Sequence, residues 1–144
     1  MSSRVLHLSH SGLPDVRIEK EALTLRKANY ELYFLGAHVK SFYLANSFVE
    51  TIPIKFSIQA KAGLPPWWGA LVRKVLRIVQ RLKPRFIHAH DLIAGKLAVE
   101  VCRSLGIPFV YDGHEYWSKE VVFTYPTVTI RLSLIPISEP TRPY

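Results

Sequence analysis

Short apolar runs alternate with longer amphipathic segments along most of this chain. Each run has the length of a buried strand, and the strands predicted from them cover 5–9, 31–36, 86–90 and 109–112. Residues 49–58 predict a further strand or an extended connection, and Pro53 favours a place at the edge of a sheet. The runs therefore predict a sheet of four or five strands.

The segments between these strands repeat apolar residues at helical spacing. Asp15 is a plausible N-cap for the first of them, and Asn29 suits the left-handed position that closes it. The predicted helices cover 16–28, 67–83 and 92–105. Strands that alternate with helices predict an α/β fold with a Rossmann-like, doubly wound and mostly parallel sheet.

Composition narrows the class of protein. A chain of 144 residues with 49% hydrophobic residues fits one folded domain and argues against disorder. Its one cysteine, Cys102, excludes a disulfide framework and a metal site built on thiolates. The first strand begins almost at the N-terminus, and no apolar stretch approaches the ~20 residues that span a bilayer. We therefore expect a cytoplasmic protein without a signal peptide.

Histidines and carboxylates follow two of the predicted strands. His88, His90 and Asp91 end one of them, and His114 and Glu115 follow the next. Parallel strands carry their carboxyl ends to one edge, where open α/β sheets bind ligands. Gly113 allows a tight turn that projects His114 into the crevice, with Glu115 fixing its tautomer. The alternative is that these polar residues only cap the next element.

The loop after the first strand offers a second candidate. Gly12 gives this loop freedom, and the backbone N–H groups at the helix start, together with Arg17, would suit an anion. The alternative is that Asp15 caps the helix and Arg17 is solvated. No Gly-x-Gly-x-x-Gly motif is present, so the sequence gives no direct sign of a dinucleotide site.

Metal binding is a further option, because His88 and His90 share one face of a strand and His114 could be a third ligand. The usual hydrolase pattern needs another Asp and His close behind, and the residues after Asp91 supply neither. We therefore predict no metal at these histidines.

Positive charge gathers in one part of the chain. The net charge is +8, and residues 51–90 hold eight Lys and Arg with no Asp or Glu. Much of this charge lies on the predicted helix 67–83, which either covers the sheet with a basic solvent face or contacts anionic lipid at the inner face of a membrane. The candidates for such a contact are Trp67, Arg73, Lys74, Arg77 and Arg81. Nucleic-acid binding is the third option and ranks last, since no recognition motif accompanies the charge, so we expect no nucleic-acid partner.

The last residues do not fit the pattern. Residues 132–144 hold three prolines without a usable period and resemble the conceptual translation of a transposase adapter oligonucleotide. The alternative is a native Pro-rich tail. We interpret 1–131 as an incomplete natural domain and 132–144 as a non-native tail, which we expect to be unstructured or poorly packed.

Taken together, the first strand, the segment 14–25, Phe86-Ile87-His88-Ala89-His90-Asp91 and Val110-Tyr111-Asp112-Gly113-His114-Glu115 resemble one known family. The chain is similar to the N-terminal, acceptor-side domain of GT-B glycosyltransferases of family 4, over residues 4 to about 120. In that family a second Rossmann-like domain with a paired-Glu motif binds the nucleotide sugar. The one local departure is Asn29, where the family usually has Gly.

The resemblance implies roles for several residues. The Gly12 loop approaches the donor, Arg17 and Lys20 lie near the acceptor, and His114 is the catalytic candidate that reaches the reacting sugar. His90, Asp91 and Glu115 join the substrate-binding candidates. The partners are then a nucleotide sugar and an acceptor, with no cofactor, and the chain alone is inactive because the donor domain is missing. Two alternatives stay open, a non-catalytic binding module that docks on a membrane or partner, and a metal-dependent hydrolase.

Overall fold

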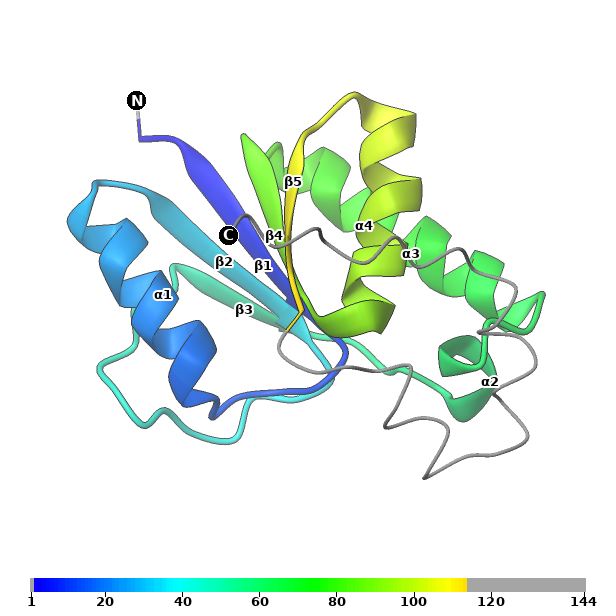
Figure 1. The fold of residues 1–144 in the computed structure, drawn as a ribbon, viewed down its shortest axis with the longest axis horizontal. Helices are drawn as coiled ribbons and strands as arrows, with labels where there is room; N and C mark the ends of the chain where they lie inside the picture. Colours follow the sequence, from blue (N-terminus) through cyan, green and yellow to red (C-terminus); the bar gives the residue numbers. More distant parts are fainter. Residues whose placement is uncertain (1, 114–144) are drawn as a thin grey trace, which may run out of the picture. The chain divides into compact units, whose positions relative to one another are not determined.

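The computed structural model describes residues 2–113, which form a five-stranded sheet with helices on both faces (Figure 1). The strand order is β3-β2-β1-β4-β5, and every neighbouring pair is parallel. The strands are β1 (Arg4–Ser9), β2 (Glu31–Gly36), β3 (Glu50–Pro53), β4 (Phe86–His90) and β5 (Phe109–Asp112). This confirms the predicted Rossmann-like, doubly wound α/β class.

Four helices connect the strands. They are α1 (Val16–Lys27), α2 (Ile58–Lys61), α3 (Trp67–Leu82) and α4 (Asp91–Leu105). A strand or an extended connection was expected over residues 49–58; β3 covers only Glu50–Pro53, and the expectation is wrong at Ile58, which opens α2. The reason is local: the Ser57 hydroxyl accepts a hydrogen bond from the Ala60 N–H and so caps a helical turn.

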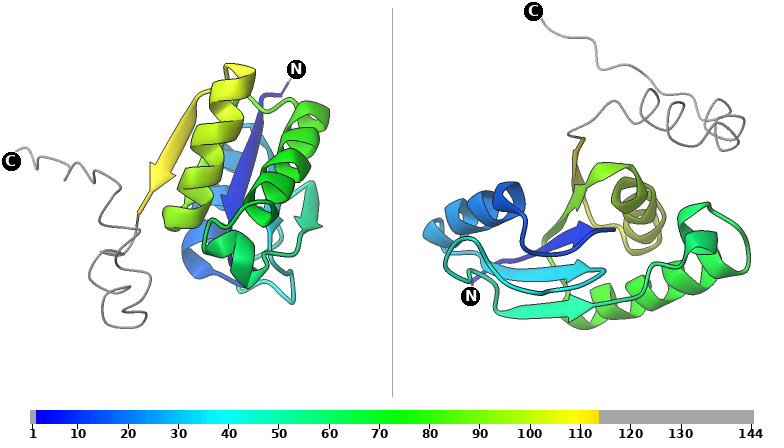
Figure 2. Two further views of the ribbon diagram at one scale, coloured as in Figure 1. Left: turned by 90° about the vertical axis from the view of Figure 1, so that its right-hand side faces the viewer. Right: turned by 90° about the horizontal axis from the view of Figure 1, so that it is seen from below.

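Successive side chains of each strand point to opposite faces of the sheet, so the hydrophobic core has two layers, one on each face. Leu6, Leu8 and Ile87 pack with the apolar faces of α3 and α4, whereas Val5 and Leu32 pack with Ile18 of α1. Figure 2 shows α3 and α4 in front of β1 and α1 behind it. Since β1 is covered on both faces, its residues from Val5 to Ser9 are all buried, polar ones included.

The two helices of the larger layer are tied to each other by polar contacts at Trp68. The Trp68 indole N–H donates to Glu100 over 2.7 Å, and the Lys96 ammonium lies 4.3 Å from the centre of the indole ring. Gly95 of α4 faces Tyr111 of β5, and a Cβ there would lie 2.7 Å from the tyrosine ring. A side chain at position 95 would therefore require the Tyr111 ring, which is 48% exposed, to move.

Several expectations lie outside the described residues. They concern His114, Glu115 and the tail 132–144. Within residues 2–113, none of the helices combines the length and the apolar character needed to cross a bilayer.

Leu97→Ala should destabilise the domain by about 2–5 kcal/mol, because Leu97 is fully buried between α4 and the sheet and its loss leaves a cavity. Val99→Ala on the same helix is the matched control, since Val99 is 40% exposed and should change the free energy of unfolding by no more than about 0.5 kcal/mol. Urea unfolding of both variants measures the difference. Equal effects would contradict the packing of α4 described here.

Candidate functional site

Three strand ends meet at one edge of the sheet. Ser9 of β1 lies opposite His90 of β4, and His90 lies opposite Asp112 of β5. The loop that holds Gly12 follows β1, and Asp91 follows β4 directly. The structure thus confirms that the Gly12 loop, His90 and Asp91 share one edge, as the βαβ connections predict.

The N-terminal end of α1 is capped by side chains from the same part of the chain. The Asp15 carboxylate accepts hydrogen bonds from the N–H groups of Arg17 and Ile18, so the capping alternative is the one observed. Buried Glu19 completes the cap by accepting from the N–H groups of Asp15 and Leu44. The first-turn N–H groups of Arg17 and Ile18 therefore already have an acceptor.

The cations of α1 remain accessible. The Arg17 guanidinium lies 3.6 Å from the Asp15 carboxylate, and nearly half of its side chain is exposed. Lys20 is exposed one turn further along the helix. Both side chains are therefore available to a ligand at this edge.

The glycine of the first loop has a packing role. Gly12 is buried, and a Cβ at this position would overlap the carbonyl oxygen and ring of His38. The close approach of two loops is enough to require glycine here. The expected approach of Gly12 to a donor stays a prediction.

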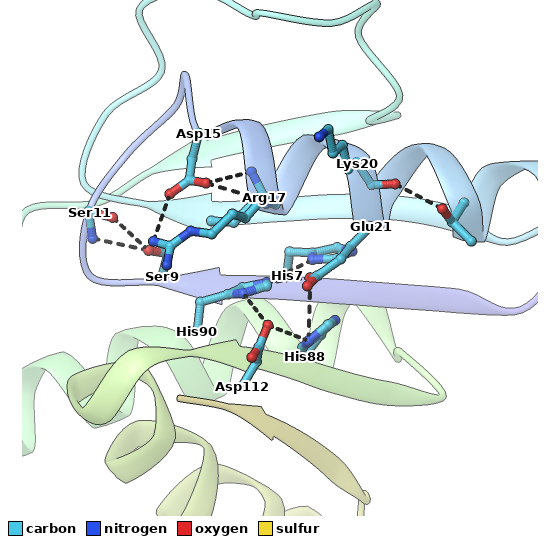
Figure 3. A network of polar contacts seen from close by, with 12 residues as sticks. His7, Ser9, Ser11, Asp15, Arg17, Lys20, Glu21, His88, His90 and Asp112 are labelled. Carbon is cyan, nitrogen blue, oxygen red and sulfur yellow. Dashed lines mark hydrogen bonds and ion pairs between the residues drawn. The ribbon is translucent and has the colours of Figure 1, made fainter. Parts of the chain in front are cut away.

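A cluster of histidines and carboxyl groups occupies the α1 face of the sheet beside this edge (Figure 3). We call His7, Glu21, His88, His90 and Asp112 the histidine cluster. His7 Nδ1 and His90 Nε2 are 3.0 Å apart, so one donates a hydrogen bond to the other. The Glu21 carboxylate lies 3.5 Å from His88 Nε2 and 3.8 Å from His90 Nε2. Asp112 lies 3.8 Å from both His88 and His90.

Burial sets the charges in this cluster. Burial first, then the neighbouring His90 and His88, hold the pKa of His7 well below its usual range, so its imidazole is neutral. Burial, then the Asp112 side chain and Asp15, raise the pKa of Glu21 to about 7, against an opposing effect of Arg17. Glu21 is thus a carboxyl group that exchanges its proton near neutral pH.

The same cluster has the composition of a metal site. One possible ligand atom from each of His7, Glu21, His88 and His90 lies within 4.8 Å of the others. Sequence reasoning named His88 and His90 but missed His7 and Glu21. The signal for His7 was a histidine in the middle of an otherwise apolar strand, whereas Glu21 looks like an ordinary charge of the first helix.

Asp91 has an unusual backbone at the junction of β4 and α4. Its φ is +69°, which is uncommon for a residue with a side chain. Its buried Oδ1 has no hydrogen-bond partner within residues 2–113. Strain of this kind gathers at functional positions, so Asp91 stays a substrate-binding candidate.

The basic helix α3 packs against the sheet through its apolar side. Trp68, Leu71 and Val75 are buried there, as the sheet-covering alternative requires. Arg81 donates to both carboxylate oxygens of Glu50, and Trp67 is 47% exposed. The basic residues Arg73, Lys74, Arg77 and Arg81 are all exposed. Contact of this face with lipid stays a prediction.

Two surface hollows lie elsewhere. One is bordered by Lys83, Pro84 and Ile107, and the other by Arg4 and Arg85, among other residues. Both belong to the opposite edge of the sheet, and neither holds the histidines. The candidate site is therefore assigned by its chemistry and not by a cavity.

Comparisons with known proteins identify the fold of this chain but not its function. No family model matches the sequence, and no curated protein does. A UDP-N-acetylglucosamine 2-epimerase matches with a TM-score of 0.51 and 12% identity, over 77% of this chain and 33% of the epimerase. The C-terminal domain of a Pyrococcus furiosus hydrogenase matches with a TM-score of 0.50 and 12% identity, over 76% of this chain and 91% of that domain. The chain thus spans a third of the epimerase, and both likenesses show a Rossmann-like fold.

The pKa of Glu21 predicts how the stability depends on pH. Its folded-state pKa of about 7 lies above the ordinary value of 4.5, so its contribution to stability is full below pH 4.5 and is lost as the pH rises to about 7. Glu21→Gln removes this titration. The variant should therefore gain stability relative to the parent across that range, measured by urea unfolding in EDTA.

The opposing titration of His7 is common to both proteins. Because the pKa of His7 is lowered, the folded protein loses stability as the pH falls below 6.5. The loss is the same in the parent and in Glu21→Gln, so it cancels when the two are compared. A stability difference that does not change between pH 4.5 and 7 would contradict the assignment of Glu21.

Proposed function

We propose that this chain is the acceptor-side domain of a retaining glycosyltransferase that takes its sugar from a nucleotide-sugar donor. The observation that carries the proposal is the meeting of the Gly12 loop, the start of α1 and the end of β4 at one edge of a parallel sheet. That edge is where open α/β sheets bind ligands. It is also where the resemblance to family 4 enzymes places substrates.

The charges at this edge suit a hydroxylated or anionic acceptor. Arg17 and Lys20 are exposed cations on α1, and Arg17 can give a planar pair of donors to a carboxylate or phosphate. His90 is 1% exposed, so it lies beneath the surface that a substrate would contact. We assign the first contact with substrate to Arg17, Lys20 and Asp91.

The likeness to the epimerase supports the fold on which the proposal depends. That protein is named for a nucleotide sugar, and it shares the sheet and helices of this chain at 12% identity. The specific evidence for glycosyl transfer comes from the strand-end residues of this sequence, with His114 as the group that reaches the reacting sugar. Transfer then requires a second domain that holds the donor.

His114→Ala in a chain that includes the donor domain should reduce sugar transfer by about 100-fold or more, because one positioned contact to the reacting sugar is lost. The experiment extends the coding sequence downstream, expresses the whole enzyme and measures transfer from labelled nucleotide sugars. Thermal unfolding of the variant should match that of the parent. Normal turnover in the variant, or a downstream sequence that encodes no second Rossmann-like domain, would contradict the proposal.

Two lysines of α1 give a matched test of the acceptor side. Lys20 lies near the carboxyl edge of the sheet, and Lys27 lies at the other end of the same helix; both are exposed. In the whole enzyme, Lys20→Gln should raise the KM for the acceptor a few-fold with little change in kcat, as the loss of one exposed charge contact predicts. Lys27→Gln should leave both constants unchanged. Equal effects would remove Lys20 from the site.

A further inference from the structure

The histidine cluster joins elements that are far apart in the sequence. His7 comes from β1, Glu21 from α1, and His88 and His90 from β4. The register of the sheet sets His7 directly opposite His88, and the alternation of strands points His7, His88 and His90 toward α1. Four possible ligand atoms from three elements therefore converge on one point.

Three of the separations in the cluster are close to those of a small tetrahedral metal site, and all four ligand atoms lie within 4.8 Å of one another. Zinc–nitrogen bonds of about 2.0–2.1 Å place neighbouring ligand atoms about 3.4 Å apart. The cluster shows 3.0 Å between His7 Nδ1 and His90 Nε2, and 3.5 and 3.8 Å from the Glu21 carboxylate to the Nε2 atoms of His88 and His90. Each of these values lies within about 0.5 Å of the tetrahedral edge.

The types of ligand atom in the histidine cluster indicate which class of metal ion would bind there. Three imidazoles and one carboxylate suit zinc and its neighbours among the divalent transition metals, whereas Mg²⁺ and Ca²⁺ prefer oxygen ligands alone. Glu21 and Asp112 together bring two carboxyl groups, which can balance the charge of a divalent cation. Cys102 takes no part, because it packs with the core on the opposite face of the sheet.

Asp112 stands where an outer partner of a metal-bound histidine would stand. His90 directs Nε2 toward His7 and Glu21, and its Nδ1 lies 3.8 Å from the Asp112 carboxylate. Carboxylates that hold the far nitrogen of a ligating histidine fix its ring and its tautomer. A small rotation of either side chain would close this hydrogen bond.

An ion can reach the cluster from solvent. The side chains of Glu21, Asp112 and His88 are 33%, 26% and 13% exposed, whereas His7 and His90 form the buried floor. The accessible side lies beside α1, so entry does not require the sheet to open.

We propose that His7, Glu21, His88 and His90 bind one zinc-class divalent ion that ties β1, α1 and β4 together. With four protein ligands the site is closed and structural. It runs against the expectation from sequence that these histidines hold no metal. That expectation looked for ligands just after His90, and the structure brings them from β1 and α1. The inference does not depend on the proposed function.

The test uses the whole untagged chain, stripped with EDTA and titrated with zinc chloride and with cobalt chloride. We expect one equivalent of zinc by calorimetry, a melting temperature that rises with zinc, and the visible absorption of tetrahedral Co²⁺. No binding, or a cobalt spectrum of an octahedral aquo type, would overturn the proposal.

Variants assign the ligands. His88→Gln and Glu21→Gln each remove one ligand and should weaken zinc binding by more than about 100-fold, since outer partners alone contribute 10–100-fold. Asp112→Asn should fall within that smaller range. His38→Gln is the matched control, because His38 is exposed and lies outside the cluster.

Folding is checked separately from binding. Each metal-free variant is compared with the parent by circular dichroism. Glu21 is an accessible helix residue, so Glu21→Gln keeps the test valid if His88→Gln fails to fold. Full zinc affinity in Glu21→Gln, or an equal loss in His38→Gln, would overturn the site.

Discussion

The parallel pairing of β1 with β4 is the contact on which the rest of this structure depends. These strands are separated in the sequence by β2, β3 and α3, yet they lie side by side at the centre of the sheet. Their register decides which residues face α1 and which face α3 and α4. A slip of one residue in β4 would send His88 and His90 into the larger apolar layer and separate them from His7, which would stay on the α1 face.

Covering β1 on both faces has a chemical consequence. A strand buried on both sides is normally apolar throughout, and a polar side chain placed there must find a partner within the protein. His7 does so with His90, and Glu21 and Asp112 extend the contacts toward solvent. The polar cluster is thus specified by the same pairing that builds the hydrophobic core, and its residues come from strands and from α1, not from loops.

The local sequence pattern was enough to predict most of the helices and strands. It was not enough to predict which residues from different helices and strands meet in the folded protein. The strands and long helices follow from apolar periodicity, and the Asp15 cap and the left-handed Asn29 follow from short-range chemistry. The short helix α2 was missed because a single turn capped by Ser57 has no period to detect. His7 and Glu21 were missed because their meeting depends on strand order and register, which no local window contains. The positive φ of Asp91 likewise reflects the fold around it.

The joint between β4 and α4 contains no linking residue, since the strand ends at His90 and the helix begins at Asp91. Without a linking residue, few backbone dihedral angles are available to change the direction of the helix relative to the strand. Gly95 allows α4 to lie close to the ring of Tyr111 in β5. The direction of α4 and the backbone position of His90 are therefore set together.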